Sequence, residues 1–226
     1  YIGLGTSQEV HPYLHAQSTA NAGVDLLKAA KTFCGQIEKT WPGKIYLVGF
    51  SQGGHATLAL QRALESLNDP QLHVVASAPV AAAVDLAGLS FPFALEGAST
   101  AHSLYLAYLV NAYCAIYNHP VNSVIADPYA ASLPILFDGE HDESEISTAL
   151  PSPPRKMFRK EFLDAYDQKQ PTWLLTALAE NETFQWSPKA PIRLYFGERD
   201  VDVSPKESRT GAEELKKRGG NVSLVS

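Results

Sequence analysis

Short apolar runs alternate with helix-compatible stretches in the first third of the chain. The run at 44–50 is followed by a helical pattern over about 53–67, and a second apolar run occupies 73–78. A further helical pattern, at 16–34, precedes the first run. Short continuous apolar runs are typical of strands buried on both faces, and strands that alternate with helices form parallel sheets with right-handed crossovers. The sequence therefore predicts an α/β fold with a mostly parallel sheet flanked by helices.

The alternation stops in the middle of the chain. Residues 79–190 are rich in proline, aromatic residues and helix-compatible stretches, and the sheet pattern resumes at 191–196. We interpret the middle as a helical cap inserted between two strands; a separate small domain is less favoured because the chain must return to the same sheet. The predicted division is core residues 1–78, cap residues 79–190 and core residues 191–226.

Both ends of the chain show strand patterns. Residues 1–6 resemble a strand end that runs into a glycine turn. After a predicted helix at 206–218, residues 221–225 begin another strand. We therefore expect the first strands of the sheet, and its last strand and helix, to lie outside this chain.

A G-x-S-x-G motif, Gly49-Phe50-Ser51-Gln52-Gly53, joins the first predicted strand to the helix after it. In a nucleophile elbow the chain turns sharply there and exposes the serine on a strained corner, and glycines flank it because the helix and strands pack closely. The N–H of Gln52 would then face a developing oxyanion. An ordinary glycine-rich turn is the alternative, but the flanking strand and helix, and a further glycine at Gly54, favour the elbow of an α/β-hydrolase fold.

A serine nucleophile needs a general base that an acid orients, and in this fold the acid follows the serine in sequence. Asp200 is the preferred acid because it lies just past the strand predicted at 191–196, where catalytic groups gather in parallel sheets. Asp202 is the close competitor, and Asp85 is a more distant one. Each of these carboxylates could instead be an ordinary solvated loop residue.

No histidine follows Asp200, although the histidine comes last in this fold. His55 lies one helical turn beyond Ser51, a position more typical of packing than of a base facing the nucleophile. We therefore expect the catalytic histidine beyond Ser226. The seven histidines are His11, His15, His55, His73, His102, His119 and His141.

Composition excludes several other functions. A net charge of −6 argues against binding nucleic acid through a basic surface. The most apolar stretch, 104–117, is shorter than the roughly 20 residues that span a bilayer. No motif indicates a cofactor or a metal site. Cys34 and Cys114 form no redox motif, and either one disulfide or two separate thiols is compatible with the sequence.

The sequence resembles the secreted bacterial lipase/esterase family of the α/β-hydrolase superfamily, which includes cell-wall-degrading esterases, and more distantly the fungal secretory lipases. The resemblance runs through nearly the whole chain and is loosest in the predicted cap. The matching segments are YIGLG at 1–5, HPYLH at 11–15, GFSQGGH at 49–55, VASAP at 75–79 and DPYA at 127–130, together with Asn181, Trp186, Pro188 and Pro191.

This resemblance implies a secreted or periplasmic enzyme that cleaves carboxylic esters, including lipids, with Ser51 as nucleophile. It assigns the acid to Asp200 through the pattern Asp200-x-x-Val203 with Pro205 nearby. It places the histidine in a loop beyond the last predicted strand and the second oxyanion donor upstream of Tyr1. Two alternatives stay open: a serine peptidase on the same fold, and a non-catalytic binding protein that has lost its base.

Overall fold

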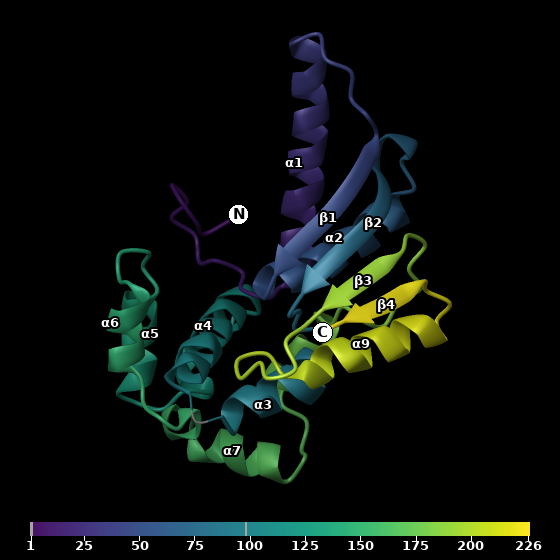
Figure 1. The fold of residues 1–226 in the computed structure, drawn as a ribbon. Helices are drawn as coiled ribbons and strands as arrows, with labels where there is room; N and C mark the ends of the chain where they lie inside the picture. Colours follow the sequence, from purple (N-terminus) through teal and green to yellow (C-terminus); the bar gives the residue numbers. More distant parts are fainter. Residues whose placement is uncertain (1, 98) are drawn as a thin grey trace. The chain divides into compact units, whose positions relative to one another are not determined.

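The computed structural model describes residues 2–97 and 99–226, which form two compact units (Figure 1). The sheet-bearing unit comprises 14–85 and 181–226, and the helical unit comprises 2–13 and 86–180. These boundaries differ from the predicted ones: 79–85 and 181–190 belong to the sheet-bearing unit, because β2 runs on through Val80 and the backbone after it bonds within that unit. Residues 2–13 belong to the helical unit rather than to the core.

The sheet is parallel throughout, as the alternating pattern predicted. Its strands pair in the order β1-β2-β3-β4, and each neighbouring pair is parallel. The four strands are β1 (Lys44–Phe50), β2 (His73–Val80), β3 (Ile192–Tyr195) and β4 (Val222–Val225). Because all four run the same way, the residues that come directly after them meet at one edge of the sheet.

Three long helices belong to the same unit and pack on one face of the sheet. Leu58 of α2 and Leu215 of α9 lie in one buried cluster with residues of β3 and β4, and Val24 of α1 lies in a second cluster with residues of β1 and β2. The helices are α1 (Ala16–Gln36), α2 (Gln52–Leu67) and α9 (Pro205–Lys217), and a short 3₁₀ turn, η1 (Pro70–Leu72), precedes β2.

The opposite face of β1 is exposed among the described residues. The side chains of Tyr46, Val48 and Phe50 alternate along the strand and are 70%, 76% and 71% exposed. The prediction that this apolar run is buried on both faces is therefore wrong in this structure. The reason is that α1, α2 and α9 contribute to clusters on the face that carries Ile45 and Ile192.

The helical unit is built from short helices around one long apolar helix. That helix is α4, and its residues from Leu106 to Cys114 are buried apart from Tyr108. The helices are α3 (Phe91–Leu95), α4 (Thr100–Ile116), α5 (Tyr129–Leu136), α6 (Glu143–Ala149), α7 (Lys160–Asp167) and α8 (Trp173–Glu180), with single turns η2 (Leu86–Ser90), η3 (Val121–Ser123) and η4 (Pro154–Met157) between them.

The N-terminal segment packs against the helical unit through aromatic rings. Tyr13 stacks on Tyr108 of α4, which stacks in turn on Phe137, each with ring centroids 4.8 Å apart. Residues 2–6 form turns with positive φ at Gly3 and Gly5, so the predicted strand end is not found in this segment. Tyr1, where that prediction began, lies outside the described residues. Cys34 and Cys114 are both free thiols.

Candidate active site

Ser51 occupies a strained corner between β1 and α2. Its backbone has φ 55° and ψ −116°, a conformation that non-glycine residues rarely adopt and that costs on the order of 1–3 kcal/mol. The hydroxyl of a serine at a helix N-cap usually accepts a hydrogen bond from a backbone N–H of the first turn, but Ser51 makes no such capping bond. The turn therefore orients this half-buried hydroxyl without using it to cap α2.

Neighbouring backbone groups hold the corner in place. The Ser51 N–H donates to the carbonyl of Val80 at the end of β2, over 2.9 Å. The Ser51 carbonyl accepts from the N–H of Gly54 at 2.9 Å and from that of His55 at 3.3 Å. The strained residue is thus fixed on one side by the sheet and on the other by the first turn of α2.

Two of the three glycines around Ser51 are sterically required. A Cβ on Gly49 would lie 2.0 Å from the carbonyl oxygen of Gly53, and a Cβ on Gly54 would lie 2.8 Å from the Cβ of Ala82. A Cβ on Gly53 meets no atom within 4 Å among the described residues. The expectation that the motif glycines on both sides of the serine exclude side chains is therefore confirmed at Gly49 and wrong at Gly53; the close contact on the helix side falls one residue later.

Gln52 begins α2 directly after the serine. Its N–H is the first amide of the helix, which is where the oxyanion donor of a nucleophile elbow lies. The helix dipole adds positive potential at the same end, so the position suits a developing negative charge.

The acid candidate Asp200 sits in the bend after β3. Its Oδ1 accepts the backbone N–H groups of Asp202 and Val203 at 2.9 and 3.0 Å, so the bend itself orients the half-buried carboxylate. The competitor Asp202 is exposed. This geometry favours Asp200 over Asp202, since a triad acid must be held in a defined orientation.

Strand ends bring the bend to the same sheet edge as the serine. Ala81 N–H donates to the Tyr195 carbonyl at 2.8 Å, and Phe196 N–H donates to the Val225 carbonyl at 3.1 Å, so the carboxyl ends of the strands are in register. Ser51 follows β1 and Asp200 follows β3, with β2 between them, which corresponds to two strand spacings or about 10 Å. Both candidates therefore follow strands whose carboxyl ends lie at the same edge of the sheet.

The third acid candidate, Asp85, lies five residues beyond β2, and its N–H donates to the buried Glu207 carboxylate at 2.9 Å.

The histidines of the sheet-bearing unit are used elsewhere. His15 caps α1 by accepting the Ser18 N–H, and the exposed His73 begins β2 at the opposite edge of the sheet. His55 is fully buried and donates from Nε2 to the carbonyl of Asn181 at 2.9 Å, and burial lowers its pKa to about 4. Among the described histidines of this unit none bonds to Asp200. His55 is buried and packed within the unit, as its spacing from Ser51 indicated.

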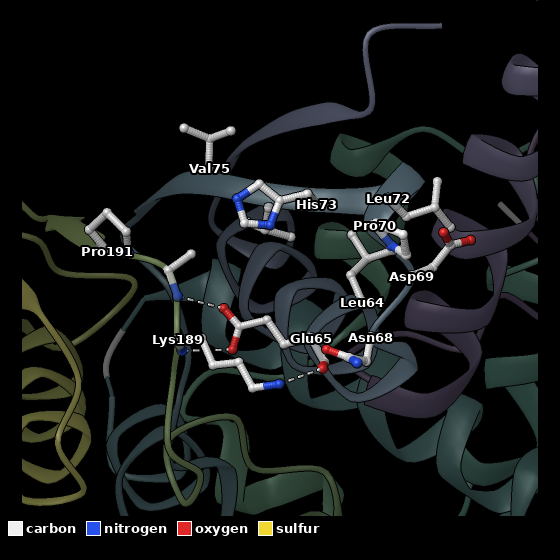
Figure 2. Close-up of a pocket in the computed structure, with 12 residues that line it drawn as sticks. Leu64, Glu65, Asn68, Asp69, Pro70, Leu72, His73, Val75, Lys189 and Pro191 are labelled. Atoms are coloured by element: carbon white, nitrogen blue, oxygen red, sulfur yellow. Dashed lines mark hydrogen bonds between the residues drawn. The ribbon is translucent and has the colours of Figure 1, made fainter.

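A cavity of about 570 Å³ lies at the other edge of the sheet, near the start of β2 (Figure 2). The carboxylate of Glu65 accepts the backbone N–H groups of Lys189 and Ala190, each at 2.8 Å, and Lys189 Nζ donates to the Glu65 carbonyl at 3.2 Å (Figure 2). These polar groups bind one another across the cavity wall, and ligands of open parallel sheets bind at the carboxyl ends instead. We therefore do not assign the reaction to this cavity.

Two buried polar residues of the sheet-bearing unit bond to distant segments; the sequence singled out Asn181 only through the family resemblance, and it did not single out Glu207. Asn181 accepts the Ala16 N–H at 2.8 Å through its side chain, and Glu207 accepts the N–H groups of Val84 and Asp85. In the described part of the chain no group of three histidine, cysteine or acidic side chains is arranged to hold a metal ion. No helix within residues 2–97 and 99–226 has the length and apolarity needed to cross a membrane.

Similar folds occur among solved structures of hydrolases. The rice cell wall degrading esterase LipA from Xanthomonas oryzae is 30% identical over 100% of this chain, with a TM-score of 0.86. A Legionella pneumophila protein described as a hydrolase candidate is 28% identical over 99% of the chain, with a TM-score of 0.91. The chain therefore has the α/β fold of these hydrolases over its whole length. This confirms the predicted resemblance and fold class.

Other relatives share the fold at lower identity, and the solved chains are longer than this one. Candida antarctica lipase A is similar at 16% identity and a TM-score of 0.74, covering 94% of this chain and 49% of that one. The chain spans 62% of the LipA chain and 61% of the Legionella chain. No protein-family model matches the sequence, and the comparison with curated proteins also gives no match.

Proposed function

We propose that this chain supplies the nucleophile and the acid of a serine esterase that cleaves carboxylic esters. The conformation of Ser51 carries the proposal, because a serine held at positive φ between a parallel strand and a helix is the geometry of an α/β-hydrolase nucleophile. The similarity to the esterase LipA supports an ester substrate, and the proposal includes lipid esters. A secreted or periplasmic location is part of the same proposal.

The reaction is acyl transfer in two halves. The Ser51 oxygen attacks the ester carbonyl while a histidine, oriented by Asp200, takes the hydroxyl proton. The Gln52 N–H and a second donor hold the tetrahedral oxyanion, and the alcohol departs with the proton from the histidine. Water then attacks the acyl-serine in the same way and releases the carboxylic acid.

The direct test uses the intact natural protein and a chromogenic short-chain ester. Ser51→Ala is expected to lower kcat by about 10⁴-fold or more, because the nucleophile is lost while folding and binding remain. Asp200→Asn is expected to lower kcat by roughly 10⁴-fold, since the histidine loses its orienting partner. Asp202→Asn is the matched control and should stay near wild type. Activity retained in Ser51→Ala, or lost equally in both aspartate variants, contradicts the assignment.

Two further measurements separate the ester hydrolase from its alternatives. An ester and an amide that share one acyl group should be cleaved at very different rates if the enzyme is an esterase, whereas a peptidase cleaves both. A fluorophosphonate probe should label Ser51 stoichiometrically in the intact protein. Folded protein that takes up no label would indicate a binding protein without a working base.

A further inference from the structure

Glu207 is a carboxylate that the proposed reaction does not use. It lies in the first turn of α9 and is 0% exposed, although carboxylates are rarely buried without hydrogen bonds or a partner charge. Its Oε2 accepts two backbone N–H groups, from Val84 and Asp85, each at 2.9 Å. Such charge-assisted bonds are stronger than neutral ones, so this carboxylate is a firm link between α9 and a segment more than 120 residues earlier.

Sequence around Glu207 would predict a local role instead. Ser204-x-x-Glu207 fits a capping box, as Asp142-x-x-Glu145 does at the start of α6. In α6 the box forms: Asp142 accepts the Glu145 N–H, Glu145 accepts the Asp142 N–H, and Glu145 is exposed. At α9 the acidic residue is buried and its Oε2 binds another segment, so its contribution is to tertiary structure.

The α9 end of the link is the end that adjoins Asp200. The helix begins at Pro205, immediately after the bend, and Ser204 caps it by accepting the Lys206 N–H. The second turn is tied to the same bend, because Arg209 pairs with Glu198 and its guanidinium lies 5.0 Å from the centre of the Phe196 ring. The position of α9 therefore sets the position of the Asp200 bend.

The other end of the link leads to the nucleophile. Val84 packs against α9 at Gly211, where a Cβ would lie 3.2 Å from Val84 Cγ2. Two residues earlier, Ala82 is fully buried against Gly54 in the first turn of α2. The Gly54 N–H in turn donates to the Ser51 carbonyl. Residues 82–84 thus contact both α2, which follows Ser51, and α9, which follows the Asp200 bend.

We infer that Glu207 is a positioning residue for the proposed esterase reaction: its buried carboxylate fixes the Asp200 bend relative to the elbow of Ser51. The two candidates follow strands separated by β2, so their spacing depends on contacts such as this one. A misplacement of about 1 Å in a catalytic group can lower the rate about 100-fold. The inference rests on the proposed function for its catalytic consequence, and on the contacts of Val84 and Asp85 for its structural one.

The catalytic test compares three variants of the intact protein on the chromogenic ester. Glu207→Ala is expected to lower kcat by about tenfold to 100-fold with KM nearly unchanged, because the acid is displaced while the substrate site is not. Glu207→Gln keeps an oxygen that can accept both N–H groups and should restore most of kcat. Glu213→Ala is the matched control, since Glu213 lies on the exposed side of α9 and pairs only with Lys217 among the described contacts.

A second measurement does not depend on activity. The N–H groups of Asp202 and Val203 bond to Asp200, so their hydrogen exchange reports whether the bend is held. Exchange should be faster in Glu207→Ala than in wild type or Glu207→Gln. An exchange rate that is the same in Glu207→Ala and wild type overturns the inference. So does a fall in kcat that equals the loss of folded protein, with the folded fraction measured by active-site titration. If wild-type protein cleaves no ester, the proposed function fails while the exchange result still decides the positioning role.

Discussion

The buried imidazole of His55 makes the stability of the sheet-bearing unit depend on pH. Its Nε2 donates to the Asn181 carbonyl, and its Nδ1 has no hydrogen-bond partner among the described residues. Because the ring is fully buried, the folded protein resists protonating it, and the pKa of His55 falls from 6.5 to about 4. The unfolded chain has no such restriction and protonates near pH 6.5.

The magnitude comes from the difference between these two pKa values. At about 1.4 kcal/mol for each pH unit, a pKa lowered from 6.5 to about 4 corresponds to about 3 kcal/mol of unfolding free energy. Between these values the unfolded state binds a proton that the folded state does not, so stability falls as the pH falls. The contribution of His55 is complete above pH 6.5 and is lost as the pH approaches 4.

A variant that removes only this group separates its titration from that of the aspartates and glutamates. In His55→Gln the amide nitrogen can replace Nε2 as the donor to Asn181, and glutamine does not titrate. Urea unfolding followed by tryptophan fluorescence suits this unit, since Trp41 and Trp186 pack against its core. From about pH 8 to about pH 4.5 the wild type should lose about 2–3 kcal/mol more than the variant. Parallel stability curves for the two proteins would refute the reasoning.

Two other perturbations have equally direct outcomes. Gly54→Ala should destabilise the protein by about 1–3 kcal/mol, because the new Cβ meets Ala82 and the Val80 carbonyl at under 3 Å, whereas Gly53→Ala meets nothing and should be neutral or slightly stabilising; equal melting temperatures would contradict this difference. Asp138→Asn should lower the pKa of His141, because the hydrogen bond that His141 Nδ1–H donates to the exposed Asp138 carboxylate raises it in the wild type; an NMR titration of His141 that shows no change would exclude that cause.

Local patterns predicted the elements of the sheet-bearing unit closely. The helix expected at 53–67 is α2 (Gln52–Leu67), and the run at 44–50 is β1 with the same bounds. These elements are specified by short-range features: the apolar run, the break at Pro42-Gly43 and the glycine turn around Ser51. A strained corner of this kind is recognisable because strand, serine and helix are contiguous in sequence.

Contacts between distant segments could not be predicted in the same way. Gly53 belongs to the motif and Gly54 follows it, yet the approach of Ala82 makes Gly54 the glycine that cannot carry a side chain. The burial of Glu207 depends on Val84, which lies in another part of the chain. The sequence around Glu207 indicates a capping box at the start of α9 instead. The boundary between the two units after residue 85 likewise depends on distant partners, because the backbone after β2 bonds to Tyr195 and Glu207.

The same distinction explains why the sequence offered one candidate nucleophile but three candidate acids. Ser51 lies in a turn between a strand and a helix that are contiguous in sequence, so its sequence neighbourhood contains most of the information, although its N–H also bonds to the distant Val80 carbonyl. An acid is positioned by the end of another strand and by the helix after it, so the sequence favoured Asp200 but left Asp202 as a close competitor and Asp85 as a more distant one. In the structure the bend donates two backbone N–H groups to the carboxylate of Asp200. Glu207 in the following helix bonds to Val84, which lies in the segment after β2. In the proposed esterase, rate losses from changes in this long-range support should thus appear in kcat, because Glu207 acts through the Asp200 bend.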